Sequence, residues 1–223
     1  GTSGFGKTTL MRMVNRMVTP TSGTVTVRGR DVAHEGPVAL RRSIGYVLQD
    51  GGLFPHRTIV DNIATVPVLE GVSKASARAD ALKLMELVGL DPSMAKRYPA
   101  QLSGGQRQRV GVARALANRA DILLMDEPFG ALDPLVRADL QRQLRRIQKS
   151  LGTTILFVTH DIDEAILLGD RIVLLREGAQ IAQEGTPRDL LLSPANDFVR
   201  EFLGTSAISE RERILEGTPD GSQ

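Results

Sequence analysis

The chain opens on the segment Gly1–Thr8, Gly-Thr-Ser-Gly-Phe-Gly-Lys-Thr, which matches the pattern G-x-x-x-x-G-K-[ST] at every fixed position. Glycines let successive backbone N–H groups curl around a phosphate chain, and the helix that follows adds a positive partial charge. In this pattern the lysine reaches the β- and γ-phosphates, and the hydroxyl is placed to ligate Mg²⁺. A chance glycine turn before a helix is the alternative. The predicted nucleotide-binding residues are Gly1, Thr2, Ser3, Gly4, Phe5, Gly6, Lys7, Thr8 and Thr9.

A phosphate loop of this kind follows a buried strand, but no residue stands before Gly1, and the sequence has no initiator methionine. We therefore expect an N-terminally truncated sequence that lacks the strand beneath the glycine loop. The predicted nucleotide site then belongs in the first place to the parent protein.

Short apolar runs alternate with helical segments in the second half of the chain. The helix expected at Pro134–Leu151 has Asp133 at its N-cap and is stopped by Gly152. Strands separated by helices predict a parallel sheet with crossover connections, and the strands are too short to span a bilayer. The strands of this alternation are Ile122–Asp126, Thr153–Thr159 and Arg171–Leu175. Two earlier strands are expected at Thr24–Arg28 and Ile44–Leu48.

The composition is that of one soluble globular domain. Lys+Arg number 28 and Asp+Glu 26, so the net charge is +2, a balance too even for a nucleic-acid footprint or a polybasic lipid anchor. The absence of cysteine excludes a disulfide framework and a Cys-ligated zinc site, and it fits a reducing cytosol.

Two carboxylates, Asp126 and Glu127, end the strand Ile122–Asp126. They would lie at the carboxyl end of a parallel sheet, where such folds bind ligands. We expect Asp126 to hold Mg²⁺, directly or through water, and Glu127 to accept a proton from the attacking water or to orient it. A solvated strand end is the more common explanation of such a pair, but the glycine loop favours the functional one.

Leu102-Ser-Gly-Gly-Gln106 precedes a helix that runs to Ala117. Ser103 and Gln106 have the spacing of a capping box, which an ordinary helix start would explain. The pair Gly104 and Gly105 is not explained by stability, because glycine is a poor helix former. Bare backbone N–H groups suit the close approach of an anion.

With these motifs in place, the chain resembles the ATPases of ABC transporters over nearly its whole length. Leu102–Gln106 is similar to the family's signature motif, and Ala131-Leu132-Asp133 to its D-loop. Gln49 resembles the Q-loop glutamine, which touches Mg²⁺ and the water, and His160 resembles the switch histidine, which contacts the γ-phosphate. The resemblance implies ATP and Mg²⁺ as cofactors, and the catalytic residues Glu127, His160 and Gln49. The metal ligands that it implies are Thr8, Gln49 and Asp126.

The resemblance also implies an α/β fold, a P-loop NTPase with a RecA-like parallel sheet core. An inserted helical subdomain at about 58–117 and a partial antiparallel β subdomain complete a nucleotide-binding domain over 1–204, followed by a polar tail at 205–223. Two such domains pack head to tail as a homodimer, so that the helix start at Ser103, Gly104, Gly105 and Gln106 would bind the γ-phosphate in trans. Asp133 of the D-loop is a further expected ATP-binding residue. The aromatic residue that stacks on adenine would be in the missing segment.

Two flanking segments, Gly52–Ile63 and Ser193–Gly204, look like those of bacterial quaternary-amine importer ATPases, which energise uptake of glycine betaine, choline, carnitine or proline. The implied partners are permease subunits, which hold the ATPase on the cytoplasmic face of the plasma membrane, and indirectly a substrate-binding protein. A permease helix would dock near Gln49–Arg57, where Leu53-Phe54-Pro55 is either an exposed contact or a loop folded on its own core.

The alternatives are an importer of another small solute and a truncated, non-catalytic fragment. A chromosome-maintenance ATPase would need a long coiled coil between Lys7 and Ser103, and no sustained heptads occur there. A translation-associated ABC protein would carry two such domains in one chain.

Overall fold

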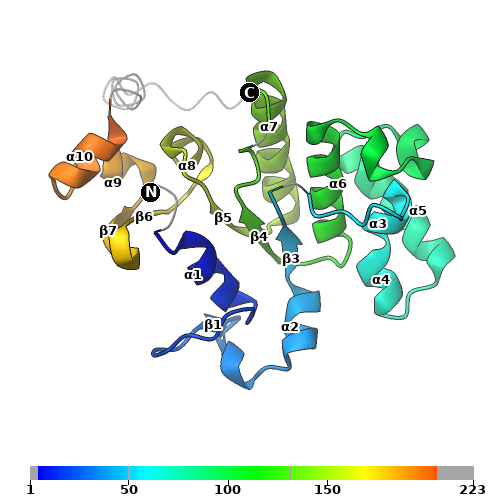
Figure 1. Ribbon diagram of the computed structural model, residues 1–223, viewed down its shortest axis with the longest axis horizontal. Coiled ribbons are helices and arrows are strands. Elements are labelled where there is room, and N and C mark those ends of the chain that lie inside the picture. Colours follow the sequence, from blue (N-terminus) through cyan, green and yellow to red (C-terminus); the bar gives the residue numbers. More distant parts are fainter. Residues whose placement is uncertain (1–4, 50, 131, 205–223) are drawn as a thin grey trace. The chain divides into compact units, whose positions relative to one another are not determined.

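The structure is a computed structural model that describes residues 5–49, 51–130 and 132–204 (Figure 1). It consists of two compact units, one formed by Thr8–Val158 and the other by Gly1–Lys7 with Thr159–Gln223. In the described part of the chain, no helix is long and apolar enough to cross a membrane.

The first unit is built on a parallel sheet in the order β3-β4-β5, which Figure 1 shows side by side. The strands are β3 (Gly45–Val47), β4 (Ile122–Asp126) and β5 (Thr154–Val158). Leu124 in the central strand pairs with Tyr46 on one side and Leu156 on the other. The parallel pairing predicted for β4 and β5 is confirmed, and β3 joins them in parallel. The pairing brings the residues after Val47, Asp126 and Val158 to one edge of the sheet.

Helix α7 (Pro134–Leu151) begins and ends where the sequence predicts. The Asp133 carboxylate accepts a hydrogen bond from the Val136 N–H, which satisfies a free donor of the first turn. Gly152 closes the helix with φ +63°, a left-handed conformation that glycine adopts without strain.

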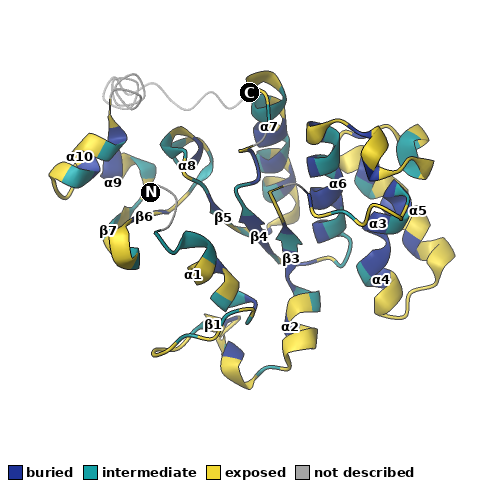
Figure 2. Ribbon diagram, viewed as in Figure 1, coloured by how far each residue is buried: buried dark blue, intermediate teal, exposed yellow. Residues whose placement is uncertain are grey.

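A group of helices lies between β3 and β4 in the sequence, and their inward faces are buried (Figure 2). On α5 the inward face is formed by Ala77, Ala81 and Met85, which are all at most 2% exposed. The elements are α3 (Ile59–Ile63), α4 (Thr65–Leu69), α5 (Lys74–Leu87), two 3-10 helices (Pro92–Lys96 and Pro99–Gln101) and α6 (Gly104–Leu116).

The amino-terminal part of the first unit packs against the sheet through a small apolar cluster. Its elements are α1 (Lys7–Val14), β1 (Thr26–Val27), β2 (Arg30–Asp31), a 3-10 turn (Val32–His34) and α2 (Pro37–Ser43). The strand predicted at Thr24–Arg28 is found in shortened form and pairs antiparallel with β2. The buried residues of the cluster are Met11, Val27, Val32, Leu40, Ile44, Leu124 and Val158.

The second unit contains α8 (Ile162–Leu168), β6 (Ile172–Arg176), a 3-10 turn (Glu177–Ala179), β7 (Gln180–Gly185), α9 (Pro187–Leu192) and α10 (Asp197–Leu203). Strand–helix alternation predicted that the segment Arg171–Leu175 joins a parallel sheet. This prediction was wrong, because in the described residues β6 pairs with β7, and the pairing is antiparallel. A tight turn at Gly178, with φ +72°, makes that hairpin. Its core is formed by Leu174, Leu191, Val199 and Leu203.

Candidate functional site

The structure describes the glycine loop from Phe5 onward. Gly6 has φ +78°, and an added Cβ there would lie 3.1 Å from the Ala179 Cβ, so both conformation and space favour glycine. Lys7 begins α1, Lys7 and Thr8 are half-buried, and Thr9 is exposed. The predicted ligands Gly1, Thr2, Ser3 and Gly4 lie outside the described residues.

Helix α1 and strand β4 meet at the centre of the site. The Thr8 hydroxyl donates a 2.8 Å hydrogen bond to Oδ1 of Asp126, although the two residues are far apart in sequence. The other carboxylate oxygen, Oδ2, lies 3.9 Å from an Arg12 guanidinium nitrogen. The structure therefore brings together the two residues for which the sequence predicts the same metal ion, and their atoms are the oxygen donors that Mg²⁺ prefers.

Glu127, which follows Asp126, has a backbone conformation that was not predicted from the sequence. Its φ is +45°, a left-handed conformation that is uncommon outside glycine and asparagine. The Glu127 N–H donates to the Val158 carbonyl (2.9 Å), and its own carbonyl accepts from the Gly130 N–H (3.2 Å). These two bonds fix the turn and the direction in which the half-buried carboxylate leaves the sheet edge. Strained residues of this kind concentrate at functional sites.

Gln49 comes to the same place from the neighbouring strand β3. Its Nε2 lies 3.5 Å, and Oε2 of Glu127 3.7 Å, from the point that a Cβ on Gly130 would occupy. The predicted pair of Gln49 and Glu127 therefore flanks Gly130. A larger residue there would contact both the amide and the carboxylate.

The start of α6 has the capping box that the sequence predicted. The Ser103 hydroxyl accepts from the Gln106 N–H (3.3 Å), and the Gln106 side-chain carbonyl accepts from the Ser103 N–H (2.9 Å). A stability explanation fails for Gly104, which is exposed and has no atom closer than 3.9 Å to an added Cβ. The same expectation for Gly105 was wrong: a Cβ there would lie 2.4 Å from Cγ1 of Val136 on α7, so helix packing requires this glycine.

His160 is exposed and lies in a braced turn of the second unit, two residues after β5 ends. The Thr159 hydroxyl accepts from the Asp161 N–H (3.0 Å) and donates to the carboxylate of Glu164 (2.6 Å). Glu164 is only 5% exposed, and Asp161 caps α8. The bracing residues Thr159 and Glu164 were not singled out from the sequence, where only their nearness to His160 could have indicated them.

Asp133, the last predicted ligand, is exposed and serves as the N-cap of α7. Of the D-loop segment, Ala131 lies outside the described residues.

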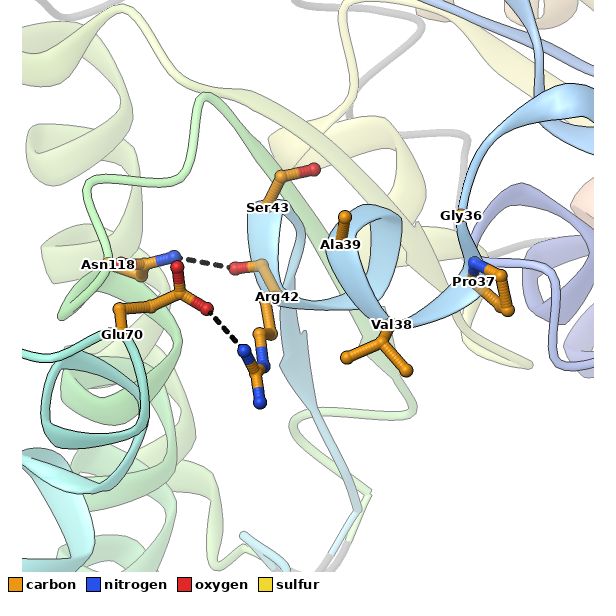
Figure 3. A pocket seen from close by; sticks show the side chains of 8 residues that line it. All are labelled: Gly36, Pro37, Val38, Ala39, Arg42, Ser43, Glu70 and Asn118. Carbon is orange, nitrogen blue, oxygen red and sulfur yellow. Dashed lines mark hydrogen bonds and ion pairs between the residues drawn. The ribbon is translucent and has the colours of Figure 1, made fainter.

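A cavity of about 580 Å³ lies away from this site, between α2 and the ends of α4 and α6 (Figure 3). Arg42 and Glu70 form an ion pair across it (3.1 Å), and the Asn118 amide donates to the Arg42 carbonyl (2.7 Å). Ser43 and Asn118, both in its lining, come shortly before β3 and β4, so the cavity is at the amino ends of these strands. Parallel sheets bind ligands at the opposite edge, where Asp126 and Glu127 lie.

The fold and the site together define a phosphate-loop NTPase of the ATP-binding cassette class. A family model described as ABC transporter matches residues 1–130. The chain belongs to the ABC transporter ATPase family. In structure, it is similar to the ATP-binding cassette MJ0796, solved as a dimer in a post-hydrolysis state with ADP and Pi, with a TM-score of 0.75, 34% identity and coverage of 84% of this chain and 83% of that one.

Among curated proteins, the chain is 50% identical to the glycine betaine/carnitine/choline transport ATP-binding protein OpuCA of Bacillus subtilis, over 99% of this chain and 56% of that protein. It is 49% identical to the glycine betaine uptake system ATP-binding protein YehX of Escherichia coli, over 99% of this chain and 71% of that protein. The chain thus spans about half the length of the first of these relatives.

Proposed function

We propose that this chain is the ATP-hydrolysing part of an ABC importer that takes up a quaternary ammonium osmoprotectant such as glycine betaine, choline or carnitine. The observation that carries the proposal is the contact between Thr8 and Asp126, which joins the phosphate loop to the acidic strand end. It occurs in a chain about half of whose residues are identical to those of ATP-binding proteins named for these solutes.

When ATP and Mg²⁺ bind, the ion supplies charge neutralisation at the phosphates. Thr8 and Asp126 would hold it, with Gln49 approaching from β3. The Glu127 carboxylate would orient the attacking water and take its proton, while Lys7 and His160 would bind the phosphates. The chain's own contribution is mostly positioning, as the bonds that fix the backbone of Glu127 indicate.

The trans half of the site would come from a second copy. Gly104 is exposed at the start of α6, where the N–H groups of a helix amino end favour a phosphate. The structural relative solved as a dimer supports this arrangement. We expect hydrolysis per chain to fall as the protein is diluted into the monomer regime.

The permease would contact the loop around Phe54, which is 41% exposed. Two guanidinium groups lie over its ring, with the Cζ of Arg57 at 5.2 Å and the Cζ of Arg114 at 6.0 Å from the ring centroid. An aromatic ring held this way is a rigid anchor for a partner helix. Through this contact the ATPase would lie on the cytoplasmic face of the plasma membrane, and the permease would connect it to a substrate-binding protein.

Magnesium-dependent ATP hydrolysis by the purified protein tests the enzymatic part. Glu127→Gln should lower kcat about 100-fold or more while ATP still binds, and Glu86→Gln, an exposed acid on α5, should leave kcat unchanged. A wild-type protein that neither binds nor hydrolyses MgATP would instead support the alternative of a non-catalytic fragment.

Uptake of labelled glycine betaine into vesicles that hold the ATPase, its permease and its binding protein tests the substrate. Unlabelled choline and carnitine should compete, and a neutral sugar should not. Active hydrolysis without uptake of any quaternary amine would favour the second candidate, an importer of another small solute.

A further inference from the structure

The helix that carries Gly104 at its start is fastened to the loop that carries Gln49. The fully buried Gln108 of α6 donates from its side-chain amide to the Leu48 carbonyl (3.3 Å). One turn and a half further along α6, Arg114 donates to two carbonyls of the same loop, those of Gly52 (2.7 Å) and Gly51 (2.8 Å).

The backbones of the helix and the loop also approach closely. A Cβ on Gly111 would lie 3.1 Å from the Gly51 Cα, and a Cβ on Gly51 would lie 2.8 Å from the Arg107 carbonyl oxygen. Gly51 has φ +73°, so both its conformation and its surroundings require glycine. No side chain separates the loop from α6 at this point, and the loop cannot slide without breaking the bonds of Gln108 and Arg114.

The groups around Arg114 are neutral. Burial lowers the pKa of its guanidinium, and within the described residues no carboxylate forms an ion pair with it. Its partners are two backbone carbonyls and the Phe54 ring. Arg114 is half-buried, and placing a charge among neutral groups has a desolvation cost that an apolar side chain of similar length would avoid. Unlike an apolar side chain, the planar guanidinium provides two hydrogen-bond donors in a fixed geometry.

We propose that Arg114 is a positioning residue that locks the Gln49 loop to helix α6, so that the loop follows any movement of the helix start at Ser103 and Gly104. The inference rests on the proposed ATPase function. It adds a role for a residue outside the predicted nucleotide and metal ligands: Arg114 holds Gln49 at the distance from Glu127 that hydrolysis needs. Its contact with Phe54 extends the same connection to the surface proposed for the permease.

A double-mutant cycle between Arg114 and Gln49 tests this role. Arg114→Met keeps the length of the side chain and removes both donors. We expect kcat for ATP to fall about tenfold with KM changed less than about twofold, since the site stays able to bind nucleotide. In the Gln49→Ala background the same substitution should lower kcat less than about twofold, because the group that Arg114 positions is already gone. Arg142→Met, on the exposed face of α7, is the matched control and should have no effect in either background.

A structural role alone would lower kcat by the same factor in both backgrounds, or would lower the melting temperature without changing kcat, and either result overturns the proposal. If Arg114→Met does not fold, Arg114→Lys takes its place, because lysine keeps the charge but not the paired donors. We expect Arg114→Lys to lower kcat by less than tenfold in the protein that keeps Gln49, and not to lower it in the Gln49→Ala background. If the wild-type chain does not hydrolyse ATP, the proposed function is refuted. If the wild-type chain hydrolyses ATP and Arg114→Met hydrolyses it equally fast, the positioning role of Arg114 is refuted.

Discussion

The two glycines at the start of α6 should behave in opposite ways when each is replaced by alanine. At Gly105 the new methyl carbon would lie 2.4 Å from Cγ1 of Val136, a β-branched side chain whose χ1 is stiff in a helix. Overpacking of this kind costs about 1–3 kcal/mol, and replacing a helical glycine returns up to about 1 kcal/mol. We therefore expect Gly105→Ala to lower the free energy of unfolding by about 1 kcal/mol, or about 2–4 °C in melting temperature for a chain of this size.

At Gly104 the nearest atoms to the new methyl carbon are 3.9 Å away. The substitution should therefore leave the melting temperature unchanged or raise it slightly, because the helix gains a better former. Hydrolysis should nevertheless fall at least about tenfold, since the methyl group stands where a phosphate of the partner's ATP must approach the backbone.

Thermal unfolding followed by circular dichroism, together with steady-state hydrolysis, separates the two effects. Val136→Ala removes the clashing methyl group, so the loss caused by Gly105→Ala should be smaller in that background. A Gly105→Ala protein as stable as wild type would show that packing against α7 does not require glycine. Full hydrolysis by Gly104→Ala would show that no ligand comes close to this residue.

Two further predictions concern polar contacts. Thr8→Ala should lower hydrolysis about 100-fold, because the ion loses a ligand, and should lower the free energy of unfolding by about 1 kcal/mol, because Asp126 loses its donor. Thr8→Ser keeps the hydroxyl and should retain most activity. Equal rates of hydrolysis in the two variants would exclude the hydroxyl as a ligand. Hydrogen bonds from Arg78 hold the pKa of Asp61 below its usual value. The pair therefore stabilises the fold above the unfolded pKa of about 3.9 and is lost as pH falls through the folded pKa, so the stability difference between wild type and Asp61→Asn should shrink in acid denaturation below about pH 4. A difference that stays constant down to lower pH would contradict this.

The sequence was sufficient to predict the bounds of an element where the residues at its two ends mark where it begins and ends. Helix α7 and strand β4 have the predicted bounds, because Asp133, Pro134 and Gly152 punctuate the helix and an unbroken apolar run marks the strand. Helix α2 was missed: it has only 7 residues, no capping side chain and one buried residue, Leu40, so it shows no apolar period. Strand β7 was missed because its sequence, Gln-Ile-Ala-Gln-Glu-Gly, is mostly polar and becomes a strand by pairing with β6.

In the site, residue types and their order along the chain predicted which groups would meet, as Thr8 and Asp126 do. Features that depend on tertiary contact were not accessible. The requirement for Gly105 arises from Val136 on another helix, and the link between Arg114 and the Gln49 loop arises from backbone carbonyls, which have no sequence pattern.

The left-handed backbone of Glu127 has a practical consequence for engineering. A non-glycine residue in this conformation costs about 1–2 kcal/mol relative to glycine, so Glu127→Gly would make the protein more heat-resistant while removing the carboxylate that hydrolysis needs. Libraries selected only for thermal tolerance should therefore enrich glycine or asparagine at this position and return inert proteins. Any screen for a sturdier version of this ATPase has to score turnover alongside melting temperature.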